Sequence, residues 1–264
     1  MSGDAVLLRG HQAGSADLPG VAWLTLNRPA ARNALSVPLM TALEAALDDI
    51  EADPAVRVVV IAGAGPAFCA GHDLREVRRL DRDAHVALFG QCSRLMQKIV
   101  GLRVPVIARV HGVASAAGCQ LVASCDLAVA ADTARFATPG VNIGLFCSTP
   151  MVALSRAIGR KAAMAMLLTG EMVDAGAATA LGLVNRSVPE AALDDAVMAM
   201  ARTIASKSPA IIGLGKPAFY AQAEMPLAEA YAYASAVMVR NMAERDAHEG
   251  IDAFLEKRAP VWGG

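Results

Sequence analysis

The sequence predicts an α/β protein of one domain, with a largely parallel sheet and a helical C-terminal region. Short, almost wholly apolar runs at residues 56–62 and 104–110 alternate with longer segments of helical periodicity over the first two-thirds of the chain. Strands that alternate with helices favour a parallel sheet. The chain has 264 residues, which suits one large domain. We place the core at residues 1–200 and a helical oligomerisation region at residues 201–264.

The first elements have clear boundaries. Residues 21–27 (VAWLTLN) predict a strand, and the Arg28-Pro29 dipeptide that follows breaks it. Ser36 is a good N-cap for a helix over residues 37–51, where apolar residues recur on one face. The Asp53-Pro54 dipeptide then ends this helix.

The later elements continue the alternation. An amphipathic helix over residues 82–101 precedes the second buried strand, and a short helix begins near Gly118. Residues 126–131 predict a further strand. Asp126 is its first residue, and we expect its side chain to form a structural hydrogen bond. From Ser148 onward we expect mainly helices, with one brief strand within residues 183–188.

Composition excludes several classes of function. Lys and Arg number 24 and Asp and Glu number 25, so no basic surface is available for nucleic acid. No apolar stretch approaches the roughly 18 residues of a membrane-spanning helix. The N-terminal segment MSGDAVLLRGHQAGSADLPG has neither signal-peptide nor transit-peptide composition. These observations predict a cytoplasmic protein with no membrane or nucleic-acid partner.

The cysteines predict buried thiols and no metal site. The chain has five cysteines, none of them in a CxxC pair or at zinc-finger spacing from a histidine. Small apolar-like thiols are common in protein cores in a reducing compartment. The residues are Cys69, Cys92, Cys119, Cys125 and Cys147.

Two loops of small residues predict a ligand site. Residues 63–74 (GAGPAFCAGHDL) and 111–121 (HGVASAAGCQL) each follow a buried strand. The first is not a dinucleotide fingerprint, because Phe68 stands where the third glycine would fall. It is not a P-loop either, because no Gly-Lys-Ser/Thr follows it. Small residues allow close backbone approach, and a helix start favours negative charge. The carboxyl ends of parallel strands are where such sheets bind ligands.

Ordered motifs extend the argument along the chain. LNRPAARNALS, FCAGHDL, VPVIARVHGVASAAGCQLVASCDLAVAADTARFATPGVNIGL, LTGEMVDAGAATALGLVN and EGIDAFLEKRAPVW occur in this order between Val21 and Trp262. They resemble the signatures of the enoyl-CoA hydratase/isomerase (crotonase) superfamily. AAGCQLVASCD and FATPGVNIGLFCSTP resemble one subgroup almost letter for letter.

The resemblance implies a fold, a substrate class and an assembly. The implied fold is a ClpP-like spiral of repeated ββα units with C-terminal helices. The implied substrate is an acyl-coenzyme A thioester of fatty-acid metabolism, with coenzyme A as part of the substrate and no tightly bound cofactor. The implied enzyme class is a lyase. Family members form homotrimers, often paired into hexamers, and the apolar helices between residues 191 and 240 agree with such contacts.

By position, the resemblance assigns the oxyanion hole to the backbone amides of His72 and Ala117. Chemistry next to a thioester builds negative charge on the carbonyl oxygen, and two preorganised donors stabilise it. Loss of one such donor costs on the order of 3 kcal/mol. The helix that begins near Gly118 adds its dipole in the same direction. Ala117 stands where most relatives have glycine, but the amide donor needs no particular side chain.

Two departures from the family pattern bear on the reaction. Family hydratases carry one glutamate in a GCEL motif and one in a PE pair, and this chain has Gln120 and Gly140 at those positions. A positioned acid or base contributes roughly 10²- to 10⁴-fold, and neither residue can move a proton. Ordinary hydration is therefore not expected. Decarboxylation needs enolate stabilisation more than a base and fits best; the alternative is a catalytically weak acyl-CoA-binding or regulatory protein.

Other side chains leave alternatives open. His72 can titrate near neutral pH, and methylmalonyl-CoA decarboxylases resemble its GHD loop, but their later tyrosine aligns with Cys147 here. The alternative is a ring that only packs. Ser148 lies where dehalogenase-like members place an aspartate, although a structural role with Thr149 as N-cap and turn residues is favoured. Gln120 either orients a substrate or water or caps the helix start.

Coenzyme A contacts carry over from the same motifs. The first motif and the GHDL loop supply small residues and cations that match the family's nucleotide and pantetheine contacts. The alternative for each cation is a solvated surface charge. The residues are Arg28, Ala31, Arg32, Ala34, Ala70, His72, Asp73, Leu74, Arg75 and Lys257.

Overall fold

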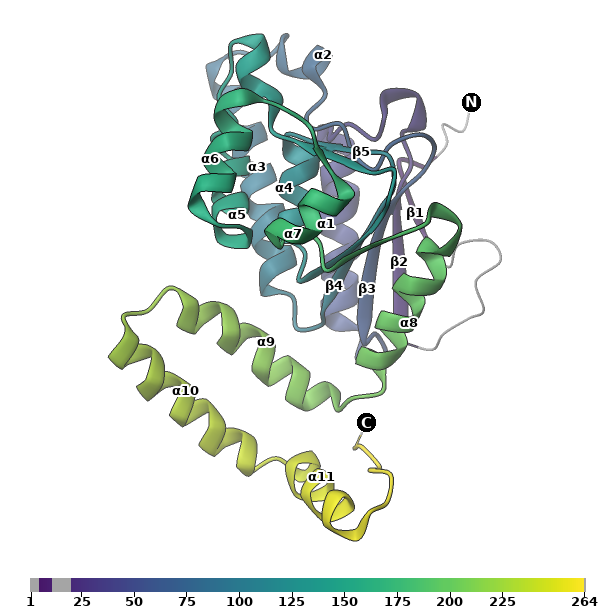
Figure 1. Cartoon of the computed structure of the whole chain (residues 1–264), viewed down its shortest axis with the longest axis vertical. Helices are drawn as coiled ribbons and strands as arrows, with labels where there is room; N and C mark the ends of the chain where they lie inside the picture. Colours follow the sequence, from purple (N-terminus) through teal and green to yellow (C-terminus); the bar gives the residue numbers. More distant parts are fainter. Residues whose placement is uncertain (1–4, 11–19, 264) are drawn as a thin grey trace.

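The main sheet of the molecule has six strands, and all neighbouring pairs but one are parallel (Figure 1). The computed structural model describes residues 5–10 and 20–263. The parallel sheet is as predicted, whereas the antiparallel edge strand β1 was not predicted. In spatial order the strands are β1 (Leu7–Arg9), β2 (Val21–Leu26), β3 (Val58–Gly63), β4 (Val106–Val110), β6 (Leu127–Ala131) and β9 (Arg186–Val188).

A second, three-stranded sheet was missed by the sequence analysis. It consists of β5 (Val113–Ser115), β7 (Arg135–Ala137) and β8 (Val173–Asp174). Its strands have only two or three residues, too few for a period-2 pattern to be recognised. Two strands of this sheet lie between a main-sheet strand and a helix in the sequence. β5 follows β4 and precedes α4 (Ala117–Ser124), and β7 follows β6 and precedes α5 (Pro150–Ala157). These are the repeated ββα units of the expected spiral.

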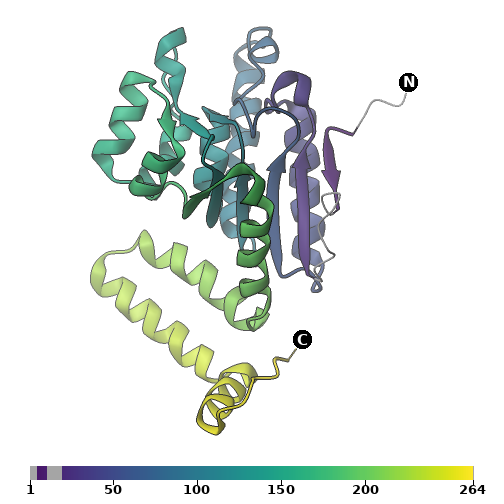
Figure 2. The same cartoon turned by 45° about the vertical axis from the view of Figure 1, so that its right-hand side comes forward.

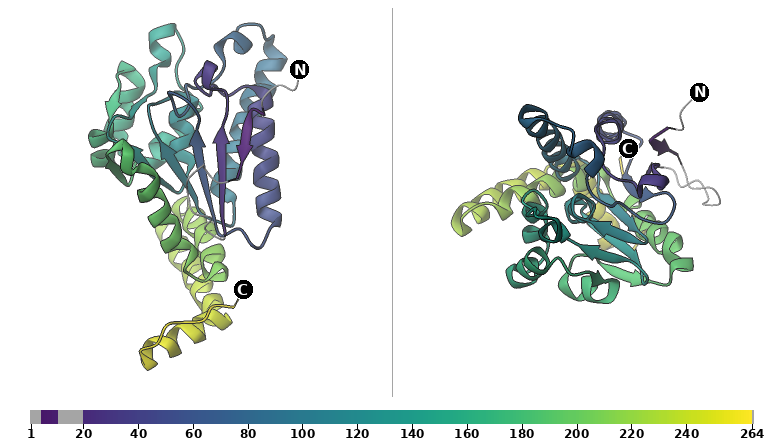
Figure 3. Two further views of the ribbon diagram at one scale, coloured as in Figure 1. Left: turned by 90° about the vertical axis from the view of Figure 1, so that its right-hand side faces the viewer. Right: turned by 90° about the horizontal axis from the view of Figure 1, so that it is seen from above.

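Helices cover both faces of the main sheet (Figure 3). Apolar residues of α1 (Val37–Ala52), α3 (Arg82–Gly101) and α4 pack against one face of this sheet. α8 (Leu193–Ala205) packs against the other face. Ser36 caps α1 as predicted, because its side chain accepts a hydrogen bond from the Leu39 amide. The other core helices are α2 (Leu74–Val77), α6 (Arg160–Thr169) and α7 (Ala175–Leu181), with 3-10 turns η1 (Pro29–Ala31), η2 (Pro139–Ile143) and η3 (Glu190–Ala192).

The last three helices extend away from the core (Figures 1 and 2). They are α9 (Pro209–Ala223), α10 (Leu227–Met242) and α11 (Arg245–Glu256). The boundary expected between residues 200 and 201 falls inside α8, where Val197 and Ala201 are packed on the sheet. Along α10, large apolar side chains are exposed, including Leu227 at 75% and Val239 at 73%. Such a surface is typical of a protein–protein contact.

Asp126 ties this extension to the core. Its carboxylate accepts a hydrogen bond from the Val106 amide at 2.7 Å and lies 2.7 Å from the Lys216 ammonium group of α9. The Tyr220 hydroxyl donates to the same carboxylate at 2.9 Å. The structural hydrogen-bonding role expected for Asp126 is confirmed. Within the described part of the chain, no helix is both long and apolar enough to span a membrane.

The five cysteines are all buried free thiols, as predicted. Burial raises the pKa of the Cys69, Cys92 and Cys119 thiols to about 12, and it also raises the pKa of Cys125. Thiols with such pKa values remain protonated at neutral pH and are poor nucleophiles. These four cysteines therefore serve as core residues.

Candidate functional site

Three segments that are far apart in the sequence meet at the carboxyl ends of β3 and β4. His72 forms a bridge with Leu35 of the first motif, and Cys69 forms one with Ala114 of the second loop. The Leu35 amide donates to the Gly71 carbonyl at 2.7 Å, and the Ser115 amide donates to the Cys69 carbonyl at 2.9 Å. The two predicted loops and the first motif therefore form one backbone framework.

Glycines make the close approach of these loops possible. Gly71 has φ +96°, and a Cβ at this position would lie 3.0 Å from the Ala116 Cβ and 3.4 Å from the Ala117 amide nitrogen. A Cβ on Gly118 would lie only 2.0 Å from the Cys69 carbonyl oxygen. Any larger residue would separate the loops. This packing brings the residue before His72 against the start of α4.

The amides of His72 and Ala117 have no hydrogen-bond acceptor among the described residues. Ala117 is the first residue of α4, where a helix has no carbonyl of its own to receive the amide. Its neighbour Ala116 has φ 49° and ψ −115°, a strained conformation for a residue with a Cβ. Two free donors, with the helix dipole behind one of them, can stabilise an anionic oxygen.

Gln120 lies one turn beyond Ala117, on the same face of α4. Its side chain is 4% exposed, and its Oε1 atom has no hydrogen-bond partner in the described residues. A buried polar atom without a partner is uncommon in folded proteins and is typical of a binding site. Helix capping does not account for this side chain.

Gly140 leaves no space for a side chain. A Cβ at this position would lie 2.8 Å from the Leu145 carbonyl oxygen and 3.0 Å from the Cys147 sulfur. The Leu145 amide also donates to the Gly140 carbonyl at 2.9 Å, which holds the segment in place. Cys147 is 7% exposed, and burial raises the pKa of its thiol. The backbone at residues 145–147 thus fills the space that a side chain at position 140 would enter.

The His72 ring is positioned mainly by packing. Both ring nitrogens are buried and have no hydrogen-bond partner among the described residues. The ring meets Phe89 of α3 in a T-shaped contact, with centroids 5.4 Å apart and planes at 87°. Burial lowers the pKa of His72, and the nearby Leu35 backbone offsets part of this effect. The ring is therefore mostly neutral at neutral pH.

Ser148 is exposed, and no hydrogen bond joins it to His72 or Gln120. Its hydroxyl donates to the Phe146 carbonyl at 3.3 Å, within the turn before α5. Thr149 is the N-cap residue of α5, but its side chain forms no capping hydrogen bond. The turn role expected for Ser148 agrees with this geometry, whereas side-chain capping of α5 by these two residues is wrong. The pyrrolidine of Pro150 at the first helical position removes one amide that a cap would serve.

Arg28 and Asp73 form an ion pair at the edge of the loops. The guanidinium lies 2.9 Å from the carboxylate, with side chains 23% and 18% exposed. Arg28 also donates to the Ala34 carbonyl. The hydrogen bond from Arg28 holds the pKa of Asp73 below its usual range. Arg28 therefore joins the first motif to the GHD loop, a contact that the sequence did not reveal.

The remaining candidate contacts lie in different parts of the molecule. Arg32, Leu74 and Arg75 are exposed near the loops, with Ala31 and Ala70 partly exposed and Ala34 buried. Lys257 ends α11 in a left-handed conformation. In Figure 1 α2 lies at the top of the molecule and α11 at the bottom. A single chain therefore does not bring Lys257 to the other candidates.

Asn33 was missed by the sequence analysis, although it lies inside the first motif. It is fully buried, and its Nδ2 donates to the carbonyls of Ala64 and Ala67, both at 2.8 Å. Its Oδ1 accepts from the Arg28 amide, and its φ of 54° is one that asparagine tolerates. Asparagine in the run RPAARNA was the available signal for a turn that anchors a loop.

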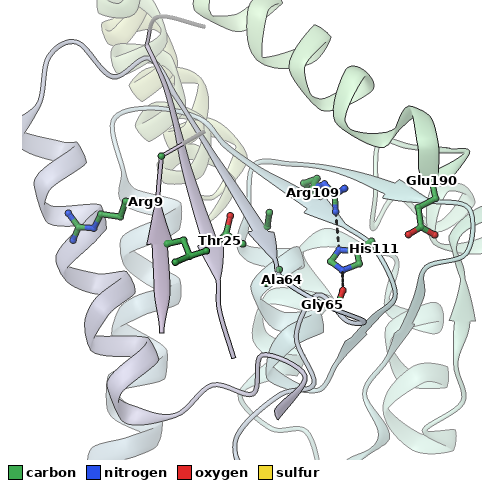
Figure 4. Close-up of a pocket in the computed structure, with 11 residues that line it drawn as sticks. Arg9, Thr25, Ala64, Gly65, Arg109, His111 and Glu190 are labelled. Atoms are coloured by element: carbon green, nitrogen blue, oxygen red, sulfur yellow. Dashed lines mark hydrogen bonds between the residues drawn. The ribbon is translucent and has the colours of Figure 1, made fainter. Parts of the chain in front are cut away.

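A pocket of about 420 Å³ lies at the same edge of the main sheet (Figure 4). Two of the polar side chains that line it, Arg109 and His111, contact each other. Arg109 lies 2.6 Å from Asp194 of α8 and 3.0 Å from the His111 ring, which in turn lies 2.7 Å from the Gly65 carbonyl. These contacts fix the start of the first loop to the end of β4. We assign this pocket a structural role.

Comparison with known proteins identifies the family. A family profile described as Enoyl-CoA hydratase/isomerase matches residues 18–264. The chain belongs to the enoyl-CoA hydratase/isomerase family. The resemblance inferred from the ordered motifs is therefore confirmed, and with it an enoyl-CoA hydratase-like protein of the crotonase superfamily.

Relatives and solved structures support both the family and the fold. The human mitochondrial enoyl-CoA hydratase domain-containing protein 3 is 50% identical over 247 residues, which cover 93% of this chain and 81% of the relative. The crystal structure of that human protein matches with a TM-score of 0.92 at 46% identity, over 97% of this chain and 100% of the other. An enoyl-CoA hydratase structure from Mycobacterium smegmatis has a TM-score of 0.93 at 53% identity, covering 97% and 98%. The crotonase fold and the subgroup resemblance are confirmed.

The cytoplasmic location expected from the sequence is contradicted. The relatives of this name from human, Xenopus laevis and rat are all named as mitochondrial proteins. The expectation rested on the composition of the N-terminal segment, of which residues 1–4 and 11–19 lie outside the described structure. Composition of such a segment is a weak indicator, because targeting signals are read by receptors rather than by overall residue content.

Proposed function

We propose that this family member binds an acyl-CoA thioester and stabilises its enolate with the amides of His72 and Ala117. The proposal is supported by the single observation that neither amide has an acceptor among the described residues, at the point where the two small-residue loops meet. Loop contacts fix the donors before a ligand arrives, so no reorganisation opposes the developing charge. The dipole of α4 acts in the same direction.

Hydration of enoyl thioesters is not part of this proposal. Hydration needs one group to activate water and one to protonate the α-carbon. Gln120 cannot titrate, and Gly140 has no side chain and no space for one. A carboxylate could replace the first residue without a change of shape, but not the second. The chemistry must therefore proceed without the two glutamates.

Decarboxylation is the reaction that these groups support best. In a thioester with a carboxylate on its α-carbon, the bond between the two carbons breaks and carbon dioxide leaves. The electron pair forms the enolate, whose charge moves to the thioester oxygen between the two amides. A proton then adds to the α-carbon. The first step needs no base, which agrees with Gln120 and Gly140, neither of which can accept a proton.

A second candidate is an acyl-CoA-binding protein with little or no turnover. One observation favours it: His72 has both ring nitrogens buried and a lowered pKa. A neutral ring is a weaker proton source for the enolate than an imidazolium. In this case the fold would retain ligand binding, with a regulatory role in fatty-acid metabolism.

Phosphate recognition and assembly complete the proposal. Arg32 and Arg75 are exposed next to the loops and suit the phosphates of coenzyme A, whereas Arg28 positions Asp73. Lys257 would serve a site in a second copy, because α11, at whose end it lies, is at the opposite end of the molecule from α2 (Figure 1). Exposed apolar residues on α10 support association as a homotrimer or a dimer of trimers.

A panel of CoA esters tests the proposal. The protein is incubated with crotonyl-CoA, malonyl-CoA, methylmalonyl-CoA and butyryl-CoA, and binding and products are measured separately. We expect saturable binding, carbon dioxide release from a 2-carboxyacyl ester, and hydration at least 10²-fold below that of a hydratase with both glutamates. Crotonyl-CoA hydration at an ordinary family rate would contradict the proposal. Binding without any product would favour the second candidate.

The variant Gln120→Glu sharpens this test. It restores one of the two glutamates at nearly constant shape, but hydration should remain low because the second proton carrier is still missing. Gln120→Leu is the matched control, which removes the amide without adding a titratable group. A large gain of hydration in the glutamate variant alone would show that one carboxyl group is sufficient.

A further inference from the structure

The orientation of the His72 ring depends on a contact outside the two loops. Neither ring nitrogen forms a hydrogen bond of normal geometry with the described residues, although the Leu35 backbone is close enough to raise the pKa of the ring. The backbone on either side is fixed, since the Leu35 amide donates to the Gly71 carbonyl and the Asp73 amide donates to the Leu35 carbonyl. The side chain is positioned mainly by packing. Its aromatic neighbour is Phe89, in a T-shaped arrangement that aromatic pairs prefer.

Phe89 is itself held from its other side. His85, four residues earlier on α3, stacks on the Phe89 ring with centroids 6.2 Å apart and planes at 19°. The His85 Nε2 lies 2.9 Å from the Val77 carbonyl oxygen at the end of α2. Because a carbonyl can only accept, this nitrogen donates, which fixes the tautomer of His85. A continuous series of contacts therefore runs from α2 through α3 to the ring of His72.

We propose that Phe89 is a positioning residue that fixes the His72 ring in the acyl-CoA site and shields it from water. His85 supports it by stacking and by its hydrogen bond to α2. The consequence for chemistry rests on the proposed function, since it assumes that the ring faces the acyl group. The effect of Phe89 on the position and hydration of the His72 ring does not depend on the proposed function. It can be measured without any ligand.

The charged groups around the ring are few. Asp73, the next residue in the chain, is paired with Arg28, and His85 is the titratable residue on α3 that stacks with Phe89. The facing residues of the first motif and of α4, Leu35 and Ala117, carry no charge. The ionisation of His72 is therefore controlled mainly by burial, which lowers its pKa. Removal of the Phe89 ring admits water and should reverse this effect.

Titration of the histidine rings by NMR tests the inference. In protein labelled at histidine, the His72 signal is assigned by its loss in His72→Asn. The wild-type ring should have a titration midpoint below the ordinary value of about 6.5, and in Phe89→Leu the midpoint should rise toward that value. Phe89→Tyr, which keeps the aromatic contact, should behave as wild type. Val86→Ala, on the same helix at a position 68% exposed, is the matched control.

The two proposals fail in different ways. A titration of His72 in Phe89→Leu that is identical to wild type would overturn the role of Phe89, whatever the protein binds. If a CoA ester is turned over, Phe89→Leu should lower kcat about tenfold, leave KM nearly unchanged and shift the pH profile; an unchanged profile would also overturn it. If no CoA ester binds to wild type, the proposed function fails, while the NMR result still decides the inference. Folding of each variant is checked by thermal unfolding.

Discussion

At the scale of single residues, positions 120 and 140 limit the chemistry for different reasons. Gln120 retains the size of a glutamate, and its unpartnered oxygen is available to a ligand. Gly140 is enclosed by the backbone of residue 145 and the sulfur of Cys147. Position 120 can therefore hold a side chain of the size of glutamate, whereas position 140 has no space for a side chain. The motif resemblance places the family's two glutamates at these positions, but the lack of space at Gly140 could not be predicted from the sequence.

Gly140→Ala should destabilise the protein by about 1–3 kcal/mol, because the added methyl group overlaps a backbone oxygen. Urea-induced unfolding measures the effect. The matched control is Gly215→Ala, where a Cβ meets nothing within 4 Å in the middle of α9. That change should stabilise by roughly 0.5–1 kcal/mol. Equal midpoints for Gly140→Ala and wild type would mean that the loop yields easily.

The ion pair of Arg28 and Asp73 predicts a pH dependence of stability. The pKa of Asp73 is lowered in the folded state, so the unfolded state binds more protons near its pKa of about 3.9. The contribution is therefore present above that value and is lost as the pH falls through the folded-state pKa. Asp73→Asn should be less stable than wild type at pH 6, by up to about 1 kcal/mol, and the difference should vanish near pH 2. A difference that stays constant with pH would exclude the ion pair as its cause.

At the scale of elements, the sequence predicted long elements with a clear apolar pattern and missed the short ones. The helices α1 and α3 have 16 and 20 residues with a clear apolar face, and the sequence predicted both nearly to the residue. The strands of the small sheet have no more than three residues and were not predicted. The meeting of the two loops was predictable, because parallel strands end at one edge. The contacts of Phe89 and Asn33 join distant segments, so no local pattern reveals them.

The contact between α9 and the core is a second test at this scale. The Lys216 side chain is 6% exposed, and its ammonium group lies 2.7 Å from the Asp126 carboxylate. Lys216→Met should cost about 3–5 kcal/mol, because it leaves a buried charge without its partner. Lys98→Met, which breaks the more exposed pair with Asp48 at 2.6 Å, should cost less than about 1 kcal/mol. Similar losses in the two variants, measured by urea-induced unfolding, would contradict the buried role of Lys216.

At the scale of the whole molecule, the C-terminal helices have more apolar surface than one chain covers. α10 has no buried residues, and its Leu227, Tyr231 and Val239 are 70–75% exposed. Association with other copies would bury this surface and could also supply Lys257 to a neighbouring site. The motif resemblance predicted such an assembly; the geometry supplies a physical reason for it.

Val239→Asp should weaken this association, because it places a charge in the apolar surface of α10. Sedimentation velocity at several concentrations measures the effect, with a smaller species expected for the variant. Val86→Ala, an exposed change on α3, is the control and should leave the wild-type distribution unaltered. If wild type sediments as a monomer at all concentrations, the assembly is wrong.

The most direct test of the account is a crystal structure of the protein with butyryl-CoA, a stable thioester. We expect the thioester oxygen to lie within hydrogen-bonding distance, about 2.7–3.2 Å, of both the His72 and the Ala117 amide nitrogens. We also expect no ionised carboxylate next to the α-carbon, since Gln120 and Gly140 stand at the positions that the motif resemblance assigns to two glutamates. A thioester bound elsewhere, or an oxygen that meets neither amide, would contradict the central claim.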